Sequence, residues 1–154
     1  MPQGDFRNAS GLTVREPQSD ADWKQYFDLR WRVLRAPWQQ PRGSETDDRE
    51  ADSLHLMLSD ASGAPLAVGR LHLNSPDEAQ IRFMAVEPGA ERQGLGGRVL
   101  AALEARAASL GMQRIVLNAR DQAIPFYQKH RYAVIGEAAT LFGRVAHVKM
   151  QKKL

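Results

Sequence analysis

The chain of 154 residues contains no cysteine. This absence excludes disulfide bonds, thiolate nucleophiles and thiolate metal sites. No apolar run approaches the roughly 20 residues that a membrane-spanning helix needs. The first residues, MPQGDFRNASG, also lack the apolar stretch of a signal peptide. We therefore expect a cytoplasmic protein that does not work in a membrane.

A large excess of charge of one sign is missing as well. Lys and Arg together number 21 and Asp and Glu 18, which gives a formal net charge of +3. This excess is too small to require nucleic acid as a partner. No His and carboxylate residues have the spacing of a metal site, so we expect no metal. The length suits one compact domain, and we expect a loose tail over residues 1–11 and a single domain over 12–154.

Hydrophobic periodicity predicts the elements of this domain. Apolar residues at spacings of three and four, after a cap at Ser19 or Asp20, predict a helix that Pro37 stops. Period-two alternation bounded by turn residues predicts strands. The expected strands are 12–16, 54–60, 65–74, 79–86, 113–119, 132–137 and 145–153, and the expected helices are 20–35, 95–110 and a short one that buries Ala123, Phe126 and Tyr127.

The order of these elements predicts an α/β fold, a mixed sheet flanked by helices. Strand 113–119 is expected to pair parallel to 81–86 through a right-handed crossover. The segment 36–50 holds two prolines, a glycine and many charges. We expect a loop there, with room for one helical turn. A long polar loop with an aromatic residue, Trp38, is either a lid or substrate wall or an ordinary solvated connection.

The segment 86–110 is the most informative part of the chain. A hydrophobic strand ends at residues 87–88, a glycine-rich loop follows, and an amphipathic helix begins after Gly94. A helix start exposes unpaired N–H groups and carries a partial positive charge, and glycines let that backbone come close to a phosphate. Arg92 and Arg98 add positive charge. We therefore expect a phosphorylated cofactor here; the alternative is a plain strand-to-helix turn.

This loop and the element order resemble the GNAT superfamily of acyl-CoA-dependent N-acyltransferases. The loop of the superfamily reads Gln/Arg-x-x-Gly-x-Gly/Ala, and residues 91–96 read ERQGLG. Both glycines match, whereas Glu91 replaces the usual Gln or Arg. The resemblance covers residues 12–151 and is to a bacterial branch of small, uncharacterised members.

A second signature of the superfamily lies downstream. It usually reads Asn-x-x-Ala-x-x-x-Tyr-x-x-x-Gly-Phe, and here Ala123 and Tyr127 match. Arg120 stands in place of the Asn, and Arg131-Tyr132 replaces Gly-Phe. Both signatures in this order, at this separation, are more specific than either alone.

The resemblance implies a mixed, mostly antiparallel sheet of six to seven strands, with a splayed parallel pair that holds acetyl-CoA. Backbone N–H groups of the glycine loop would bind the pyrophosphate, and the free edge of the central strand would pair with pantetheine. An N–H group on that strand would also face the thioester oxygen. The residues assigned to coenzyme A in this way are Met84, Ala85, Val86, Arg92, Gln93, Gly94, Leu95, Gly96, Gly97, Arg98, Asn118, Arg120 and Lys129.

The resemblance also implies catalytic roles. Tyr127 matches the general acid that protonates the departing thiolate; the alternative is a packed aromatic residue on a helix face. An amine acceptor arrives protonated and needs a base. Glu78, His72 and His147 are the candidates, and the sequence does not choose among them. Dimers are common in the family, so a homodimer is a further expectation.

Acceptor specificity in this fold usually lies in the first helix, the loop after it and the last hairpin. Arg32, Arg35 and Trp38 lie in the first two of these segments. Two arginines near an opening favour an acceptor that carries a carboxylate or phosphate. The alternative is solvated surface charge.

The expected function is transfer of an acetyl group from acetyl-CoA to a primary amine of a small molecule or peptide, by direct attack. A Rossmann site or a P-loop is excluded, because a third glycine and a Gly-Lys-Ser/Thr sequence are missing. Two alternatives stay open. The departures at Glu91, Arg120 and Arg131 also suit a non-catalytic acyl-CoA-binding module. The other alternative is a nucleic-acid binder that uses four basic residues on one helix, Arg120, Lys129, His130 and Arg131. Strongly salt-dependent binding to nucleic acid would reveal it.

Overall fold

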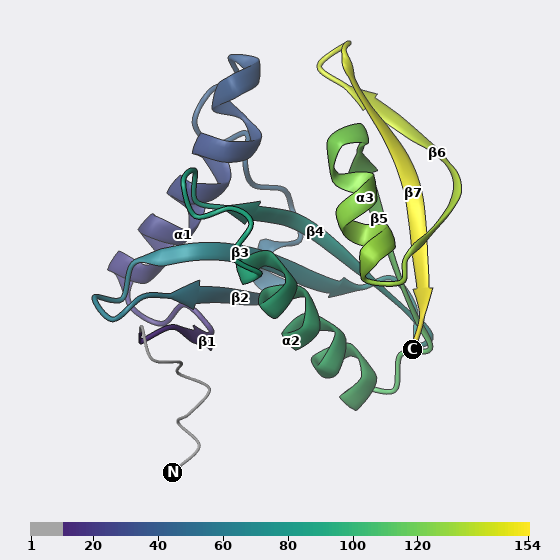
Figure 1. The fold of residues 1–154 in the computed structure, drawn as a ribbon, viewed down its shortest axis with the longest axis horizontal. Helices are drawn as coiled ribbons and strands as arrows, with labels where there is room; N and C mark the ends of the chain where they lie inside the picture. The colour runs from purple at the N-terminus through teal and green to yellow at the C-terminus, as the bar shows by residue number, and fades with distance from the viewer. Residues whose placement is uncertain (1–10) are drawn as a thin grey trace. The chain divides into compact units, whose positions relative to one another are not determined.

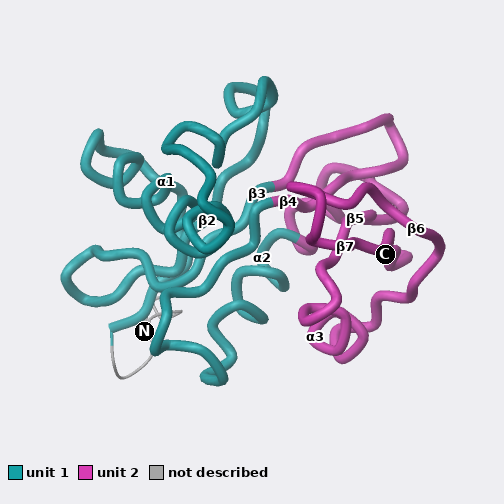
Figure 2. The backbone as a smooth tube through the Cα atoms, turned by 90° about the horizontal axis from the view of Figure 1, so that it is seen from above, with its two compact units in different colours: residues 1–70, 83–103 teal, residues 71–82, 104–154 magenta. Residues whose placement is uncertain are grey.

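The computed structural model describes residues 11–154 (Figure 1). The expected tail therefore lies outside the described residues, apart from Gly11. The chain divides into two compact units, unit 1 with residues 1–70 and 83–103 and unit 2 with residues 71–82 and 104–154 (Figure 2). Each unit is described by itself below, and the single domain expected over 12–154 stays a prediction.

Seven strands form one mixed sheet in the order β1-β2-β3-β4-β5-β7-β6. The pair β4–β5 is parallel, whereas β1–β2, β5–β7 and β6–β7 are antiparallel. The predicted fold class, a mixed and mostly antiparallel sheet with helices, is confirmed. The strands are β1 (Thr13–Arg15), β2 (Leu54–Ser59), β3 (Pro65–Leu73), β4 (Glu78–Val86), β5 (Arg114–Arg120), β6 (Ala133–Leu141) and β7 (Val145–Lys153).

The helices also lie close to their predicted positions. They are α1 (Asp20–Leu34), α2 (Leu95–Ser109) and α3 (Ile124–Lys129), with short 3₁₀ turns η2 (Ala36–Trp38), η3 (Glu50–Asp52) and η4 (Asp121–Ala123). The predicted loop 36–50 thus begins with one helical turn and leads into a second. Within residues 11–154, no helix is long and apolar enough to cross a bilayer.

In unit 1, α1 packs against the sheet (Figure 1). Tyr26 and Leu29 of α1 are fully buried against Met57, Val68 and Ala85, which come from β2, β3 and β4. Spacings of three and four residues put both α1 side chains on one face of the helix. This face explains why the apolar periodicity of the sequence locates α1 correctly.

A glycine lets α2 approach the sheet in unit 1. A Cβ atom added to Gly69 would lie 2.9 Å from Leu103 Cδ1 and 3.1 Å from Val99 Cγ1, both on α2. Successive strand residues point to opposite faces, so the side chain of Arg70 points to the other side, towards α1. The strand β3 thus offers a helix-packing surface on one side and a buried guanidinium on the other.

In unit 2, β5 lies between β4 and β7. It pairs with β4 over Glu78–Gln80 and with β7 along its whole length. The parallel direction is as predicted, but the register joins the first residues of β4 rather than 81–86. The extended backbone of β4 is interrupted further along, because Phe83 adopts a left-handed φ of 60°. The helix α3 lies beside β5 (Figure 1).

The N-terminus of α1 is capped as the sequence predicts. The Ser19 hydroxyl accepts a hydrogen bond from the Asp22 N–H group, and the Asp22 carboxylate accepts one from the Ser19 N–H group. Arg15 of β1 donates to both carboxylate oxygens of Asp22, at 2.7 and 3.1 Å. These hydrogen bonds, that of Arg15 first, hold the pKa of Asp22 well below its usual range.

Asp22→Asn is expected to lower the free energy of unfolding by about 1 kcal/mol at neutral pH, because it removes the ion pair and half of the capping box. A lowered native pKa contributes stability above the unfolded pKa of about 4, and this contribution disappears as the pH falls through the native pKa. Urea unfolding at neutral and strongly acidic pH measures the effect. The difference from wild type should shrink in acid, whereas the neighbouring substitution Asp20→Asn should not reproduce this pattern.

Candidate functional site

The loop between β4 and α2 presents a row of backbone donors. Gly94 directly precedes α2, has a φ of 77° and carries no side chain that could cap the helix. The first amide bonded to this helix end is that of Arg98, whose N–H group donates to the Gly94 carbonyl at 3.1 Å. The N–H groups of residues 92–97 make no hydrogen bond within residues 11–154. These amides are therefore available to an anion.

The electrostatics of this loop also favour an anion. The start of α2 carries the positive end of the helix dipole, and Arg92 is exposed beside it with a φ of 65°. The loop contains two carboxylates, that of Glu87, which Arg32 binds, and that of Glu91. Oε1 of Glu91 accepts the Gly89 N–H group at 2.7 Å, so it is bound at the beginning of the loop and not at the amides of residues 92–97. The loop thus fits a diphosphate despite the departure at Glu91.

The end of β4 offers backbone groups rather than side chains. Ala85 belongs to the core of unit 1, and Met84 packs over Gly69. The Glu87 N–H group donates to the Leu66 carbonyl at 2.8 Å, which keeps the end of β4 joined to β3. The side chain of Met84 is therefore a packing group.

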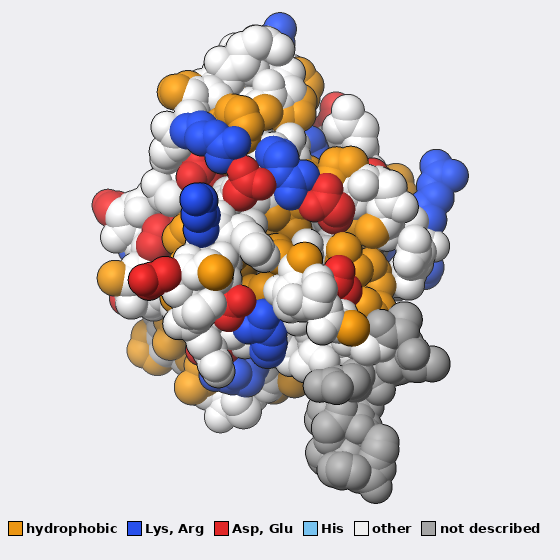
Figure 3. Space-filling view, turned by 90° about the vertical axis from the view of Figure 1, so that its left-hand side faces the viewer, with side chains coloured by type: hydrophobic (Ala, Val, Ile, Leu, Met, Phe, Trp, Pro, Cys, Tyr) orange, Lys and Arg blue, Asp and Glu red, His pale blue; other side chains and the backbone are white. Residues whose placement is uncertain are grey.

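Arg32 and Arg35, predicted to bind the acceptor, have partners within unit 1. Arg32 donates to both oxygens of Glu87 at 2.8 Å and to Asp28 at 2.7 Å. Asp28 also accepts from Arg42 at 2.7 Å, so these contacts form a small network of ion pairs. Figure 3 shows one face on which acidic and basic side chains lie close together. Arg35 is buried and donates to the backbone carbonyls of Ser44 and Leu34. An acceptor anion would have to displace these partners.

Trp38, the third residue predicted for the acceptor side, lies in η2 directly after α1. Its backbone N–H group donates to the Arg35 carbonyl at 3.0 Å, and its side chain is half-buried. It therefore stays a candidate wall residue.

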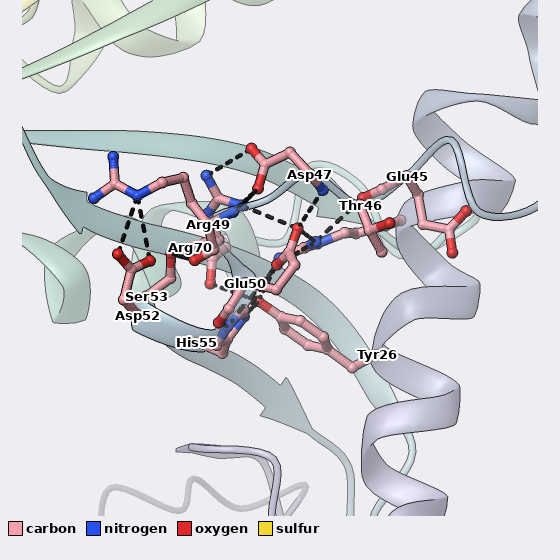
Figure 4. Close-up of polar contacts among 12 residues, drawn as sticks. Tyr26, Glu45, Thr46, Asp47, Arg49, Glu50, Asp52, Ser53, His55 and Arg70 are labelled. Carbon is pink, nitrogen blue, oxygen red and sulfur yellow. Dashed lines mark hydrogen bonds and ion pairs between the residues drawn. The ribbon is translucent and has the colours of Figure 1, made fainter.

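A buried ionic network that sequence reasoning missed lies on the α1 side of unit 1 (Figure 4). Arg30 and Arg70 have no exposed surface. Arg70 binds Asp47 at 2.6 and 3.0 Å, and both arginines donate to Glu50 at 3.0 Å. The network ties the loop after α1 to the helix and to β3. In the sequence, this network is indicated by an arginine, Arg70, within the otherwise apolar strand PLAVGRLHL.

His55 extends this network. Its Nε2 lies 2.8 Å from the Glu50 carbonyl, and its Nδ1 lies 2.9 Å from the Tyr26 hydroxyl. Burial lowers the pKa of His55, so the ring is neutral at physiological pH. A pocket of about 430 Å³ lies beside it, and its walls include Trp23 and Phe27. None of the residues predicted for the acceptor lines this pocket.

In unit 2, Tyr127 of α3 is buried among aromatic rings. The rings of Phe126 and Tyr132 lie edge-on to it, at 5.0 and 5.7 Å between centroids. Within the part of the chain that the structure describes, no residue forms a hydrogen bond with the Tyr127 hydroxyl. Burial raises the pKa of Tyr127, and the positive charge of Arg120 opposes this only in part. The hydroxyl is therefore protonated at neutral pH and able to donate a hydrogen bond.

The other predicted residues of unit 2 lie on β5, β7 and α3. Asn118 is exposed on β5 opposite Lys149, and Arg120 is in register with His147 at the end of β5. His147 Nδ1 lies 2.9 Å from the Val145 carbonyl. Lys129 is exposed at the end of α3.

Glu78 and His72, two of the three predicted bases, are joined through Asn74. Glu78 accepts hydrogen bonds from Asn74 at 2.8 Å and from Arg114 at 3.0 Å, and these interactions lower the pKa of Glu78. A carboxylate with a lowered pKa is a weaker base. His72 is buried, with Nε2 3.1 Å from Asn74 Oδ1.

Residues 11–154 contain no cluster of three or more His, Asp or Glu side chains that could hold a metal ion. The groups that remain available to a ligand are the amides of residues 92–97 in unit 1 and the Tyr127 hydroxyl in unit 2. Both are hydrogen-bond donors. The amides of unit 1 can bind a phosphate group, and the Tyr127 hydroxyl of unit 2 can donate to an anion.

Comparison with known proteins identifies the relatives of this chain. Residues 23–132 match the model of the acetyltransferase (GNAT) family. The uncharacterized N-acetyltransferase YjcF of Bacillus subtilis (strain 168) is 30% identical over 135 residues, which cover 88% of this chain and 95% of that protein.

Solved structures share the fold. Aminoglycoside 6'-N-acetyltransferase complexed with coenzyme A has a TM-score of 0.77 and 15% identity, over 92% of this chain and 96% of that one. A GNAT family acetyltransferase from Elizabethkingia anophelis with acetyl-CoA bound has a TM-score of 0.77 and 13% identity, over 96% of this chain and 100% of that one.

Gly94→Ala tests whether the loop needs glycine for its backbone conformation. A Cβ atom at Gly94 would meet nothing within 4 Å, so only the φ of 77° opposes the substitution. We expect a loss of about 1 kcal/mol in the free energy of unfolding, measured by urea denaturation. Gly136→Ala is the matched control, since Gly136 also has open space but no left-handed φ. An equal effect of both substitutions would contradict the interpretation.

Proposed function

Because the chain belongs to the acetyltransferase (GNAT) family, we propose that it transfers the acetyl group of acetyl-CoA to a primary amine of a small molecule or peptide. Acyl transfer itself follows from family membership. The observation that carries the cofactor assignment is the row of amides at residues 92–97, which have no partner within the described residues. The same run of residues holds both glycines of the family loop.

In unit 1, the amides of residues 92–97 would bind the diphosphate of coenzyme A. Arg92 and Arg98 would add positive charge beside them. The backbone of Met84, Ala85 and Val86 would pair with the pantetheine arm, and one of these N–H groups would polarise the thioester carbonyl. In support, β4 continues to Val86, well beyond the residues Glu78–Gln80 that pair with β5. When bound, acetyl-CoA supplies an activated acyl group.

In unit 2, the Tyr127 hydroxyl would act on the leaving thiolate. The amine nitrogen attacks the thioester carbonyl, the new C–N bond forms, and the C–S bond breaks with its electrons on sulfur. Burial raises the pKa of Tyr127 above that of an ordinary phenol, and a thiol has a pKa of about 8.5. Full proton transfer from Tyr127 is therefore uphill, so its contribution is a hydrogen bond to the developing thiolate. Asn118, Arg120 and Lys129 remain proposed contacts of the cofactor.

We assign the base to His72. An imidazole nitrogen can accept the proton that the attacking amine must lose. Glu78 is less suited because Arg114 and Asn74 lower its pKa. Asn74 also donates to Gln80, the last residue of β4 in register with β5, which places the His72 network where the two strands stop pairing. His147 is the alternative base.

The second candidate function is an acyl-CoA-binding module without turnover. It is favoured by the departures from the family signatures at Glu91, Arg120 and Arg131. One of them is accommodated in the structure, since Arg131 adopts the left-handed φ of 73° that suits the glycine of the signature. Turnover distinguishes the two functions.

Tyr127→Phe is expected to lower kcat by about 10²-fold in a thiol-release assay with acetyl-CoA and a panel of amines. Binding of acetyl-CoA, measured by calorimetry, should be unchanged, because the diphosphate is held by the loop of unit 1. Tyr132→Phe is the control, since the Tyr132 hydroxyl donates to Glu104 and is not assigned to the reaction.

Two results would contradict the proposal. Binding of acetyl-CoA without amine-dependent thiol release would favour the non-catalytic module. If calorimetry shows no heat of binding at millimolar acetyl-CoA, and the Tm of the protein does not change, both proposed functions are excluded.

A further inference from the structure

One face of the sheet in unit 2 is rich in positive charge. Residues that lie directly opposite each other on neighbouring antiparallel strands point to the same face. Three pairs of β5 and β7 share one face in this way: Arg114 with Lys153, Asn118 with Lys149, and Arg120 with His147. We call this face of unit 2 the open face.

The other face of the same strands is packed. Leu117 of β5 and Met150 of β7 are directly opposite each other and are buried there. Lys152 also points to this side, where its Nζ lies 3.0 Å from Glu104 Oε1 of α2. On the open face, by contrast, Asn118 is exposed although it belongs to a strand with a mostly buried sequence. The open face is therefore the one that a ligand can meet.

The positive charges of the open face are not matched by carboxylates. Within residues 11–154, the side chains of Lys149 and Lys153 form no ion pair and no hydrogen bond. One carboxylate is in register on this face, that of Glu78, and its two oxygens accept from Arg114 and Asn74. These hydrogen bonds, that of Asn74 first, lower the pKa of Glu78, and the positive charge of Lys149 adds to their effect. This influence of Lys149 agrees with its position on the same face.

Lys149 lies beside open space. Its partner on β6 is Gly136, which has no side chain. A Cβ atom added to Gly136 would meet nothing within 4 Å, so a ligand group has room there. His147, one of the candidate bases, lies two residues before Lys149 on the same face, roughly 7 Å along the strand. An anion beside Lys149 would thus be close to a group that can take a proton.

We propose that Lys149 is a substrate-binding residue that selects an amine acceptor with an anionic group, a carboxylate or a phosphate. A partly buried ammonium group without a carboxylate partner binds such an anion through charge-assisted hydrogen bonds. An acceptor held by its anion presents its amine on the face that carries two candidate bases, Glu78 and His147. This assignment rests on the proposed function, in which the acceptor is a primary amine.

Matched pairs of amines test this selection. We would compare β-alanine with propylamine and phosphoethanolamine with ethanolamine, by calorimetry of binding and by thiol release with acetyl-CoA. In the wild-type protein, the anionic member of at least one pair should bind more tightly and have the higher kcat/KM, and the pair that shows this identifies the anion. Lys149→Gln should weaken binding of that member by about tenfold and leave its neutral counterpart unaffected.

Two variants serve as controls. Lys149→Arg keeps the charge and should keep most of the preference for the anionic amine. Lys152→Gln removes the same charge from the packed face of the same strand, and the ratio of the two kcat/KM values should stay at its wild-type level. This ratio does not depend on the fraction of protein that is folded.

The outcomes separate the acceptor site from the proposed function. Equal binding of both members of each pair by the wild-type protein would overturn the role of Lys149, and this result needs no variant. Thiol release with a preference that Lys149→Gln leaves unchanged would also overturn it, while acetyl transfer would stand. A preference in binding that Lys149→Gln abolishes, without thiol release from any amine, would support the anion site and contradict turnover. Salt-dependent binding of an oligonucleotide that requires Lys149, without binding of the anionic amines, would overturn the proposal in favour of nucleic acid.

Discussion

Two guanidinium groups without exposed surface, Arg30 and Arg70, constrain unit 1 more than any other feature. A buried charge must be paired, and the carboxylates that pair them, Asp47 and Glu50, come from the loop after α1. The loop must therefore close over the sheet. The ring of Phe83 lies against both guanidinium groups, at 4.3 and 5.0 Å from their carbon atoms. These contacts help to hold Phe83 in its left-handed conformation, which costs about 1–3 kcal/mol. Phe83 directly precedes the backbone of β4 that we assign to the thioester.

The parts of the fold that depend on local periodicity could be predicted from the sequence. The apolar face of α1, its cap at Ser19 and the start of α2 after Gly94 all follow from neighbouring residues, and each lies where expected. The register of β4 with β5 could not be predicted, because it depends on how two strands that are distant in the chain meet, and the left-handed φ of Phe83 is not visible in the sequence either. The same holds for the loop 36–50: its polar composition is visible in the sequence, but its arginine partners are not.

In the candidate site, too, some residues could be predicted from the sequence and others could not. The glycine loop and Tyr127 could be proposed from the sequence because a motif contains them. Asn74 could not be predicted because no motif contains it. It is hydrogen-bonded to both His72 and Glu78, and these contacts are visible only in the structure. For Arg32, an arginine near an opening predicts an anion in the substrate, and the sequence does not show that its guanidinium binds Glu87 and Asp28.

The tyrosines show why unsatisfied donors identify a site in this protein. The chain has 3 tyrosines. Tyr26 is hydrogen-bonded to His55, and Tyr132 donates to Glu104. The Tyr127 hydroxyl has no such partner within residues 11–154 although its ring is buried. Buried polar groups are normally paired, because an unpaired one costs about 1–3 kcal/mol. The Tyr127 hydroxyl and the amides of residues 92–97, which have no hydrogen-bond partner within the described residues, are the donors that we assign to a ligand.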